Sequence, residues 1–217
     1  MALNLGGGSL TSSYSSLYLG NAQSMLSQSL LRLSSGQRIN KPSDDPGGLA
    51  VSMKLKNAIT VTEATKRNVD NALSYTDTQD SALESVADIL DRMSTLKTSY
   101  GSGTATTSDK SSYASEFKEL QKQLDVFKSE TFNSMSLFSS SAVSKQVMIS
   151  SRGESGPTIS ISSLNISGAL SVSSGVNLAN ATGSVTISGI SIGNLTNAIT
   201  QVASLRATSG ATSSRLQ

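Results

Sequence analysis

Apolar residues recur along the first third of the chain at helical spacing. Between Leu10 and Leu33 the large apolar positions include Leu19, Leu26, Leu30 and Leu33, three, four or seven residues apart, with Ser, Gln and Asn between them. This spacing predicts a helix with one narrow apolar stripe. The side chains on its other faces are small and polar, so we expect the stripe to pack against a second helix, as in a coiled coil. Packing of the stripe against the core of its own domain is the alternative.

Residues typical of helix ends and helix starts follow this stripe. Gly36 supplies a helix end, and Pro42 prevents continuation of the helix. Asp44 and Asp45 precede Pro46, which predicts a capped start of the next helix with Pro in its first position. Carboxylates here also favour the positive end of a helix dipole, so we assign the paired aspartates to capping rather than to acid–base catalysis.

A long helical pattern runs from about Gly47 to Tyr100 and contains no further Pro. Its stripe drifts around the helix, which is typical of a coiled coil or an elongated bundle; the stripe residues are Leu55, Ile59, Val69, Leu73, Leu83, Val86, Leu90, Met93 and Leu96. A Gly, Ser and Thr segment from Gly101 to Ser112 predicts a turn region. The next apolar residues repeat every four or three positions and predict a second helix folded back antiparallel: Tyr113, Phe117, Leu120, Leu124 and Phe127.

Beyond Ser139 the composition shifts to Ser, Thr, Gly, Val and Ile. Short alternating stretches predict strands; they carry the pairs Val147/Ile149, Ile159/Ile161, Val185/Ile187 and Ile190/Ile192. Helical spacing returns at Leu195, Ile199, Val202 and Leu205. We therefore expect a mainly α fold, an elongated antiparallel helical bundle or coiled coil with a small β-rich outer insert. The expected divisions are 1–42 for the N-terminal helix and connecting spoke, 43–142 for a long helical hairpin, 143–193 for the insert and 194–217 for a return helix.

Composition narrows the range of functions. The 217 residues include no Cys and no His, which removes thiol nucleophiles, imidazole bases and the commonest zinc ligands. Hydrophobic residues make up 36% and aromatic residues 4%, so a self-contained core is thin and assembly with other chains is favoured. Net charge is +2, too small to indicate nucleic-acid binding, and no apolar run is long enough to insert in a membrane. We expect no enzyme activity, no catalytic residue, no cofactor and no metal.

A specific resemblance lies in the residues around the first helix end. The segment Leu31-Arg32-Leu33-Ser34-Ser35-Gly36-Gln37-Arg38-Ile39-Asn40, followed by Asp44-Asp45-Pro46-Gly47-Gly48-Leu49-Ala50, resembles the N-terminal core of bacterial flagellins. The resemblance continues through Arg67-Asn68, Leu90-Asp91-Arg92-Met93 and Thr131-Phe132-Asn133, and Ser204 to Ala211 resembles the start of the family's C-terminal helix.

This resemblance implies a structural subunit of a flagellar filament, a homopolymer built for motility. It implies release to the cell exterior through the flagellar type III export apparatus, without a cleaved signal peptide. The intersubunit residues would be Leu19, Leu26, Leu30 and Leu33, and the spoke residues Arg38, Asp44, Asp45 and Pro46. Family members continue beyond the equivalent of Gln217, so we expect a truncated or divergent chain in which residues 10–33 are poorly ordered in the monomer.

The resemblance also implies recognition by the animal Toll-like receptor that senses flagellin. The matching positions are Arg92, Leu96 and Glu116. Core packing for Leu96 and a solvated helix face for Arg92 and Glu116 are the alternatives. Two other functions remain open at this point: a hook–filament junction protein, and a secreted receptor ligand or adhesin.

Overall fold

The computed structural model describes residues 7–141, 143–150, 152, 155–173, 176–179 and 185–217. The chain divides into two compact units, residues 1–60 and 61–217, and the boundary falls inside a long helix. Helices dominate both units, so the expected mainly α fold is confirmed.

The first unit contains helix α1 and the start of helix α2. Helix α1 spans Gly7–Ser35, in agreement with the apolar spacing. It ends where Gly36 takes a φ of 67°, a left-handed conformation that glycine adopts without a side-chain clash. Helix α2 spans Pro46–Tyr100 without interruption, and Pro46 is its first residue, as the sequence predicted.

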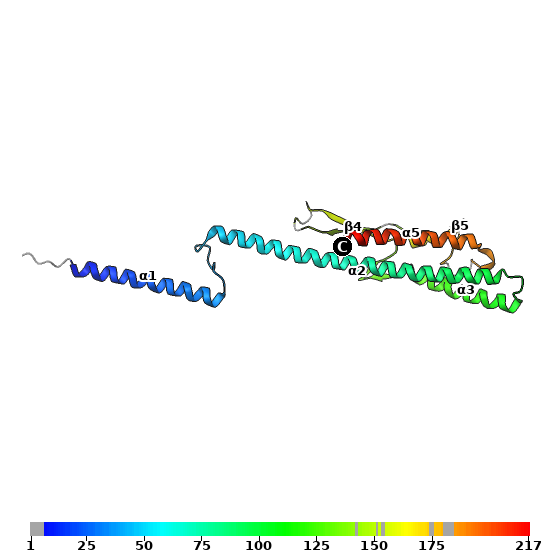
Figure 1. Cartoon of the computed structure of the whole chain (residues 1–217), viewed down its shortest axis with the longest axis horizontal. Helices are drawn as coiled ribbons and strands as arrows, with labels where there is room; N and C mark the ends of the chain where they lie inside the picture. The colour runs from blue at the N-terminus through cyan, green and yellow to red at the C-terminus, as the bar shows by residue number, and fades with distance from the viewer. Residues whose placement is uncertain (1–6, 142, 151, 153–154, 174–175, 180–184) are drawn as a thin grey trace, which may run out of the picture. The chain divides into compact units, whose positions relative to one another are not determined.

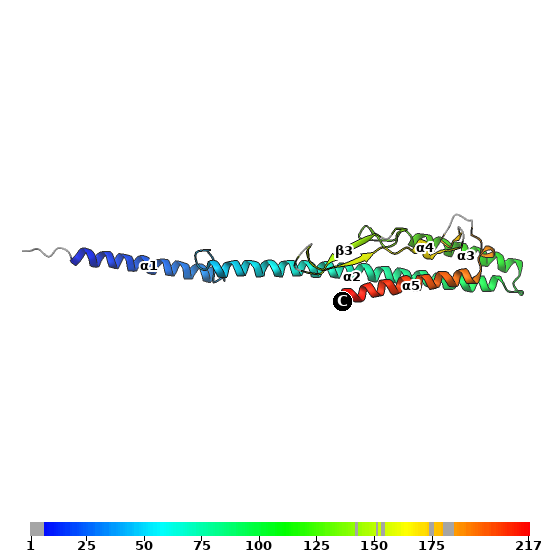
Figure 2. The same cartoon turned by 90° about the horizontal axis from the view of Figure 1, so that it is seen from above.

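In the second unit, helices α3 and α5 lie along α2 (Figures 1 and 2). Helix α3 spans Thr107–Phe127. It begins inside the segment 101–112, which the sequence predicted to be a turn region as far as Ser112. The reason is a capping box: the Thr106 Oγ1 accepts from the Asp109 N–H, while the Asp109 carboxylate accepts from the Thr106 N–H. The Thr-x-x-Asp pattern is visible in the sequence and marks this start.

Helix α5 spans Ile192–Leu216 and buries Leu195, Ala198 and Val202. Ser191 caps it by accepting from the Asn194 N–H. The strands predicted at Val185/Ile187 and Ile190/Ile192 are wrong, because Ile187–Gly189 forms a 3₁₀ turn, η2, and Ile192 opens α5. Alternation over so few residues fits a turn as well as it fits a strand, and the Ser cap decided in favour of the helix.

Three two-stranded antiparallel sheets complete the second unit. Strands β1 (Thr131–Phe132) and β2 (Met135–Ser136) are joined by Asn133 and Ser134, both at positive φ. Strands β3 (Ser144–Met148) and β4 (Thr158–Ser162) pair with Val147 opposite Ile159, which confirms strands at those positions, although Ile149 lies just outside β3. A short helix, α4 (Ile166–Ala169), precedes β5 (Ser171–Ser173) and β6 (Val176–Asn177).

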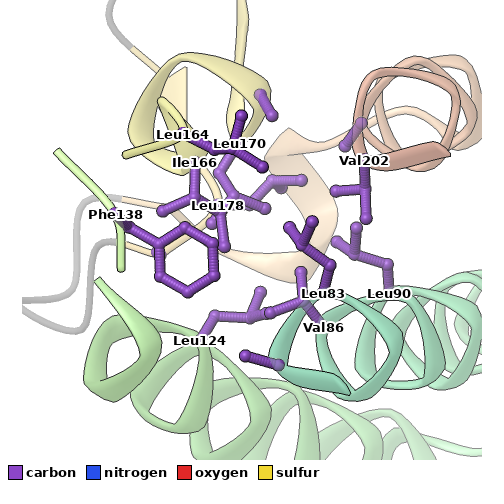
Figure 3. Packing of buried hydrophobic residues seen from close by; sticks show 14 of the residues in the cluster. Leu83, Val86, Leu90, Leu124, Phe138, Leu164, Ile166, Leu170, Leu178 and Val202 are labelled. Atoms are coloured by element: carbon purple, nitrogen blue, oxygen red, sulfur yellow. The ribbon is translucent and has the colours of Figure 1, made fainter. Parts of the chain in front are cut away.

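The core of the second unit joins its helices to the segment that follows them. Figure 3 shows side chains from α2, α3 and α5 meeting apolar side chains of residues 138–178; the labelled residues are Leu83, Val86, Leu90, Leu124, Val202, Phe138, Leu164, Ile166, Leu170 and Leu178. Residues expected to form an outer insert therefore share the helices' core. Burying each large apolar side chain stabilises this arrangement by roughly 1.5–3 kcal/mol.

The long stripe of α2 is buried along only part of its length. Burial begins at Ala72 and continues to Leu96, whereas the side chains of Leu55 and Ile59 are 58% and 59% exposed. The sequence pattern is the same along both parts. What differs is that residues of the second unit cover the part of the helix beyond Val69.

Candidate assembly surface

The first unit presents apolar side chains to solvent along both of its helical segments. The four expected intersubunit leucines are all exposed, Leu33 by 82% and Leu19 by 68%. Together with these four leucines, the same unit exposes Tyr14, Leu17, Tyr18, Met25, Leu31, Val51, Met53, Leu55 and Ile59. We call these residues the apolar assembly surface. So many exposed large apolar side chains on one unit are typical of an interaction site.

Asp44 organises the connection between α1 and α2. Its Oδ2 accepts hydrogen bonds from the backbone N–H groups of Asn40 and Lys41, both at 3.2 Å, and its Oδ1 accepts from Gln28 Nε2 at 2.8 Å. The backbone N–H of Asn40, followed by that of Lys41 and the Gln28 amide, lowers the pKa of this carboxyl. Asp44 thus fixes the loop rather than the helix start, and Gln28 is a partner that the sequence pattern did not reveal.

Asp45 caps α2. Its Oδ1 accepts from the Gly48 N–H at 2.8 Å, which satisfies one of the free donors in the first helical turn. Gly48 is required there because an added Cβ would lie 2.8 Å from the Asp45 Cγ and 3.0 Å from the Ile39 Cδ1. Asp45 and Pro46 thus lie at the start of α2, where Asp45 binds a backbone N–H of the first turn, whereas Asp44 binds the preceding loop.

A hollow of about 490 Å³ lies beside this connection. It is lined by Gln37, Arg38, Ile39, Leu49, Ser52, Met53 and Lys56. Two cations therefore line the hollow and no carboxylate does. Arg38 and Lys56 are exposed and take part in no ion pair among the residues that the structure describes.

The residues expected to contact the receptor are only partly brought to the surface. Arg92 on α2 forms an ion pair with Glu116 on α3, Nη2 to Oε1 at 2.6 Å, and both side chains are solvent-accessible. The bond to Glu116 raises the pKa of the Arg92 guanidinium. Leu96 is 2% exposed and packs in the core, so it offers almost no surface in this structure.

The described part of the chain contains no group of three or more residues able to hold a metal ion. No helix found there is long and apolar enough to cross a membrane. Tyr75 is buried, which raises its pKa, and its hydroxyl donates to the Ser136 carbonyl at 3.0 Å. This contact ties α2 to β2 and serves packing.

Comparison with known proteins identifies the family. The family model for the bacterial flagellin N-terminal helical region matches residues 10–142. The chain belongs to the flagellin family. Flagellin of Listeria monocytogenes is 32% identical over 154 residues, which cover 70% of this chain and 54% of that protein. The flagellar filament 30.7 kDa core protein of Treponema maltophilum is 30% identical over 144 residues, covering 64% and 50%.

The fold agrees with this family. The crystal structure of Bacillus cereus flagellin superposes with a TM-score of 0.56 at 26% identity, covering 70% of this chain and 85% of that one. The chain spans about half the length of the curated relatives it matches. Those relatives are described as flagellins and filament core proteins, which are structural proteins.

Proposed function

We propose that this flagellin-family chain is a structural subunit of a bacterial flagellar filament and assembles with copies of itself. The observation that carries the proposal is the apolar assembly surface on residues 14–59. Covering these side chains in a polymer would recover the hydrophobic free energy that the monomer leaves unused, at about 25 cal/mol per Å². Leu19, Leu26, Leu30 and Leu33 are the intersubunit residues in this proposal, and Arg38, Asp44, Asp45 and Pro46 hold the spoke beside them.

Export through the flagellar type III apparatus to the cell exterior belongs to the same proposal. It is supported by the family membership and by the filament relatives. The alternatives, a hook–filament junction protein or a secreted ligand or adhesin, make different predictions about polymerisation.

Seeded polymerisation of the purified chain on flagellar filament fragments, followed by electron microscopy, tests the proposal. We expect elongation by the parent chain and its loss in a Leu19→Ser, Leu26→Ser, Leu30→Ser variant. Val126→Ser is the matched control, because Val126 is 62% exposed but lies on α3, outside the apolar assembly surface. Failure of the parent to elongate would reject the filament subunit, and capping of seeds without growth would favour the junction protein.

Recognition by the animal flagellin-sensing Toll-like receptor is a second proposal. The exposed Arg92–Glu116 pair supports it, and Leu96 would act by supporting the helix face from the core. We expect Arg92→Ala and Glu116→Ala to reduce activation of receptor-bearing reporter cells by the monomer, and Glu119→Ala to leave it unchanged. Glu119 pairs with Lys122 on the same helix and serves as the matched control. Equal activation by all variants would reject this surface.

A further inference from the structure

Helix α2 carries a line of acidic residues. On an ideal helix they fall within an arc of about 80° and extend over about 32 Å; they are Asp70, Asp77, Asp80, Glu84, Asp88 and Asp91. No Lys or Arg interrupts the helix between residues 68 and 91. We call these six residues the acidic stripe. Like charges at this spacing repel one another, so the stripe costs stability in an isolated helix.

The acidic stripe lies away from the core-facing side of α2, and one edge of it borders α5. Leu83, Val86 and Leu90 point into the packed interior (Figure 3), about half a turn away from Asp77 and Asp88. Arg206 of α5 reaches the stripe, with its Nε 2.9 Å from Asp80 Oδ1 and its Nη2 3.5 Å from Glu84 Oε2. Asp70, Asp77, Asp88 and Asp91 are exposed, and no ion pair within the described ranges involves them.

The first unit carries the opposite charge. Residues 1–60 include five Lys or Arg and two Asp, and both aspartates are occupied as acceptors for backbone N–H groups. Arg38 and Lys56 line the 490 Å³ hollow, whose lining includes no carboxylate. Arg38 also lines a second hollow together with Arg32, Asp44 and Asp45, and the two carboxylates there already accept from backbone N–H groups. The chain therefore has a hollow lined by two cations on one unit and a row of acidic residues on the other.

We propose that the acidic stripe of one copy binds the Arg38–Lys56 hollow of a second copy. The proposal rests on the filament function, because it assigns a polar contact to the same polymer. Charge complementarity within one chain favours a second copy as the occupant. A single exposed ion pair contributes little to the binding free energy. A row of such pairs raises the association rate and selects the register in which two copies bind. The apolar assembly surface supplies most of the affinity, and the charged contact sets the alignment.

Charge reversal and charge exchange test this contact in the seeded elongation assay. At low salt we expect Lys56→Glu and Asp88→Lys each to elongate roughly tenfold more slowly than the parent. An equimolar mixture of the two variants should recover most of the rate, because each supplies the charge that the other lacks. Lys54→Glu and Glu130→Lys are the matched controls, since both make the same charge change at exposed positions outside the hollow and the stripe. Circular dichroism of each variant verifies its helix content.

Disulfide trapping locates the contact directly, since the chain contains no Cys. We expect polymerised mixtures of Lys56→Cys and Asp88→Cys chains to form cross-linked dimers under mild oxidation, and mixtures of Lys54→Cys and Asp88→Cys chains to form far fewer. Undiminished elongation by both reversed variants, together with no preferential cross-link, would overturn this contact while parental elongation still supports the filament function. A parent that does not elongate would overturn both.

Discussion

Gly48 shows how a single residue shapes the connection between α1 and α2. Its backbone N–H binds Asp45, and its missing side chain leaves space for Ile39. Glycine inside a helix lowers helix stability by about 0.5–1 kcal/mol relative to alanine. At this position the absence of a Cβ allows the side chains of Asp45 and Ile39 to approach the backbone closely.

We expect Gly48→Ala to destabilise the start of α2 by about 1–2 kcal/mol, because the new Cβ would displace the Asp45 cap. Hydrogen exchange at the Leu49 amide, which bonds to the Asp45 carbonyl, measures the effect. Gly20→Ala in α1 is the control, since nothing lies within 4 Å of its Cβ position and added helix propensity should stabilise that helix. Equal protection in Gly48→Ala and the parent would contradict the steric argument.

Asp109 gives the start of α3 a pH dependence. The Thr106 hydroxyl, and after it the Thr106 N–H, hold the pKa of Asp109 below its ordinary value of 3.8. The stabilisation is complete above that ordinary value and is lost as the pH falls through the lowered native pKa. We expect Thr106→Ala to bring the pKa of Asp109 back toward 3.8, as measured by NMR titration; an unchanged pKa would show that the capping box does not hold the carboxylate.

At the scale of elements, two buried amides attach the segment after α3 to the helices. Gln79 on α2 donates from Nε2 to the Leu137 carbonyl at 2.7 Å and to the Ser162 carbonyl at 3.3 Å. Gln121 on α3 donates to the Val185 carbonyl at 3.2 Å. Each amide donates to backbone carbonyls of the segment after α3, and the Leu137 carbonyl also accepts from the Leu164 N–H at 3.2 Å.

Gln79→Leu should therefore destabilise the second unit by about 1–3 kcal/mol, although leucine is apolar and similar in size, because the buried hydrogen bonds from the amide to the Leu137 and Ser162 carbonyls are lost. Urea unfolding followed by circular dichroism measures this change. Gln123→Leu on the exposed side of α3 is the matched control and should stay within about 0.5 kcal/mol of the parent. A Gln79→Leu chain as stable as the parent would mean that the amide contributes no net free energy.

At the scale of the whole molecule, the two units differ in how much of their apolar surface they bury. The large side chains of the second unit meet in one core, while those of the first remain exposed. Hydrogen-bonded helices without buried packing open locally at low free-energy cost.

We expect native-state hydrogen exchange in the monomer to separate these units. Amides of Leu83 to Leu96 should exchange slowest, and those of residues 12–33 should exchange within the fastest class. Polymerisation should slow exchange in residues 12–33 by at least about tenfold, since it would cover the apolar assembly surface. Strong protection of residues 12–33 in dilute monomer would contradict the expectation that α1 lacks tertiary support.

The sequence by itself determined α1 and α2 with their boundaries, and the approximate positions of α3 and α5. Gly36, the Asp45–Pro46 start and the spacing of apolar residues act within a few positions of one another, so local steric and hydrogen-bonding rules predict α1, α2 and the location of α3 and α5. The motif around Arg38 and Asp44 likewise indicates the flagellin family without any tertiary structure. The intersubunit role of the four leucines stays a prediction.

Only the tertiary structure decided which parts of those helices are buried. Leu55 and Leu83 belong to one stripe, yet one is exposed and the other buried, because burial depends on which distant segments cover the helix. The same reason explains Leu96 in the core and the amide contacts of Gln79. Long-range packing selects among local conformations of similar free energy, and spacing along the chain does not encode it.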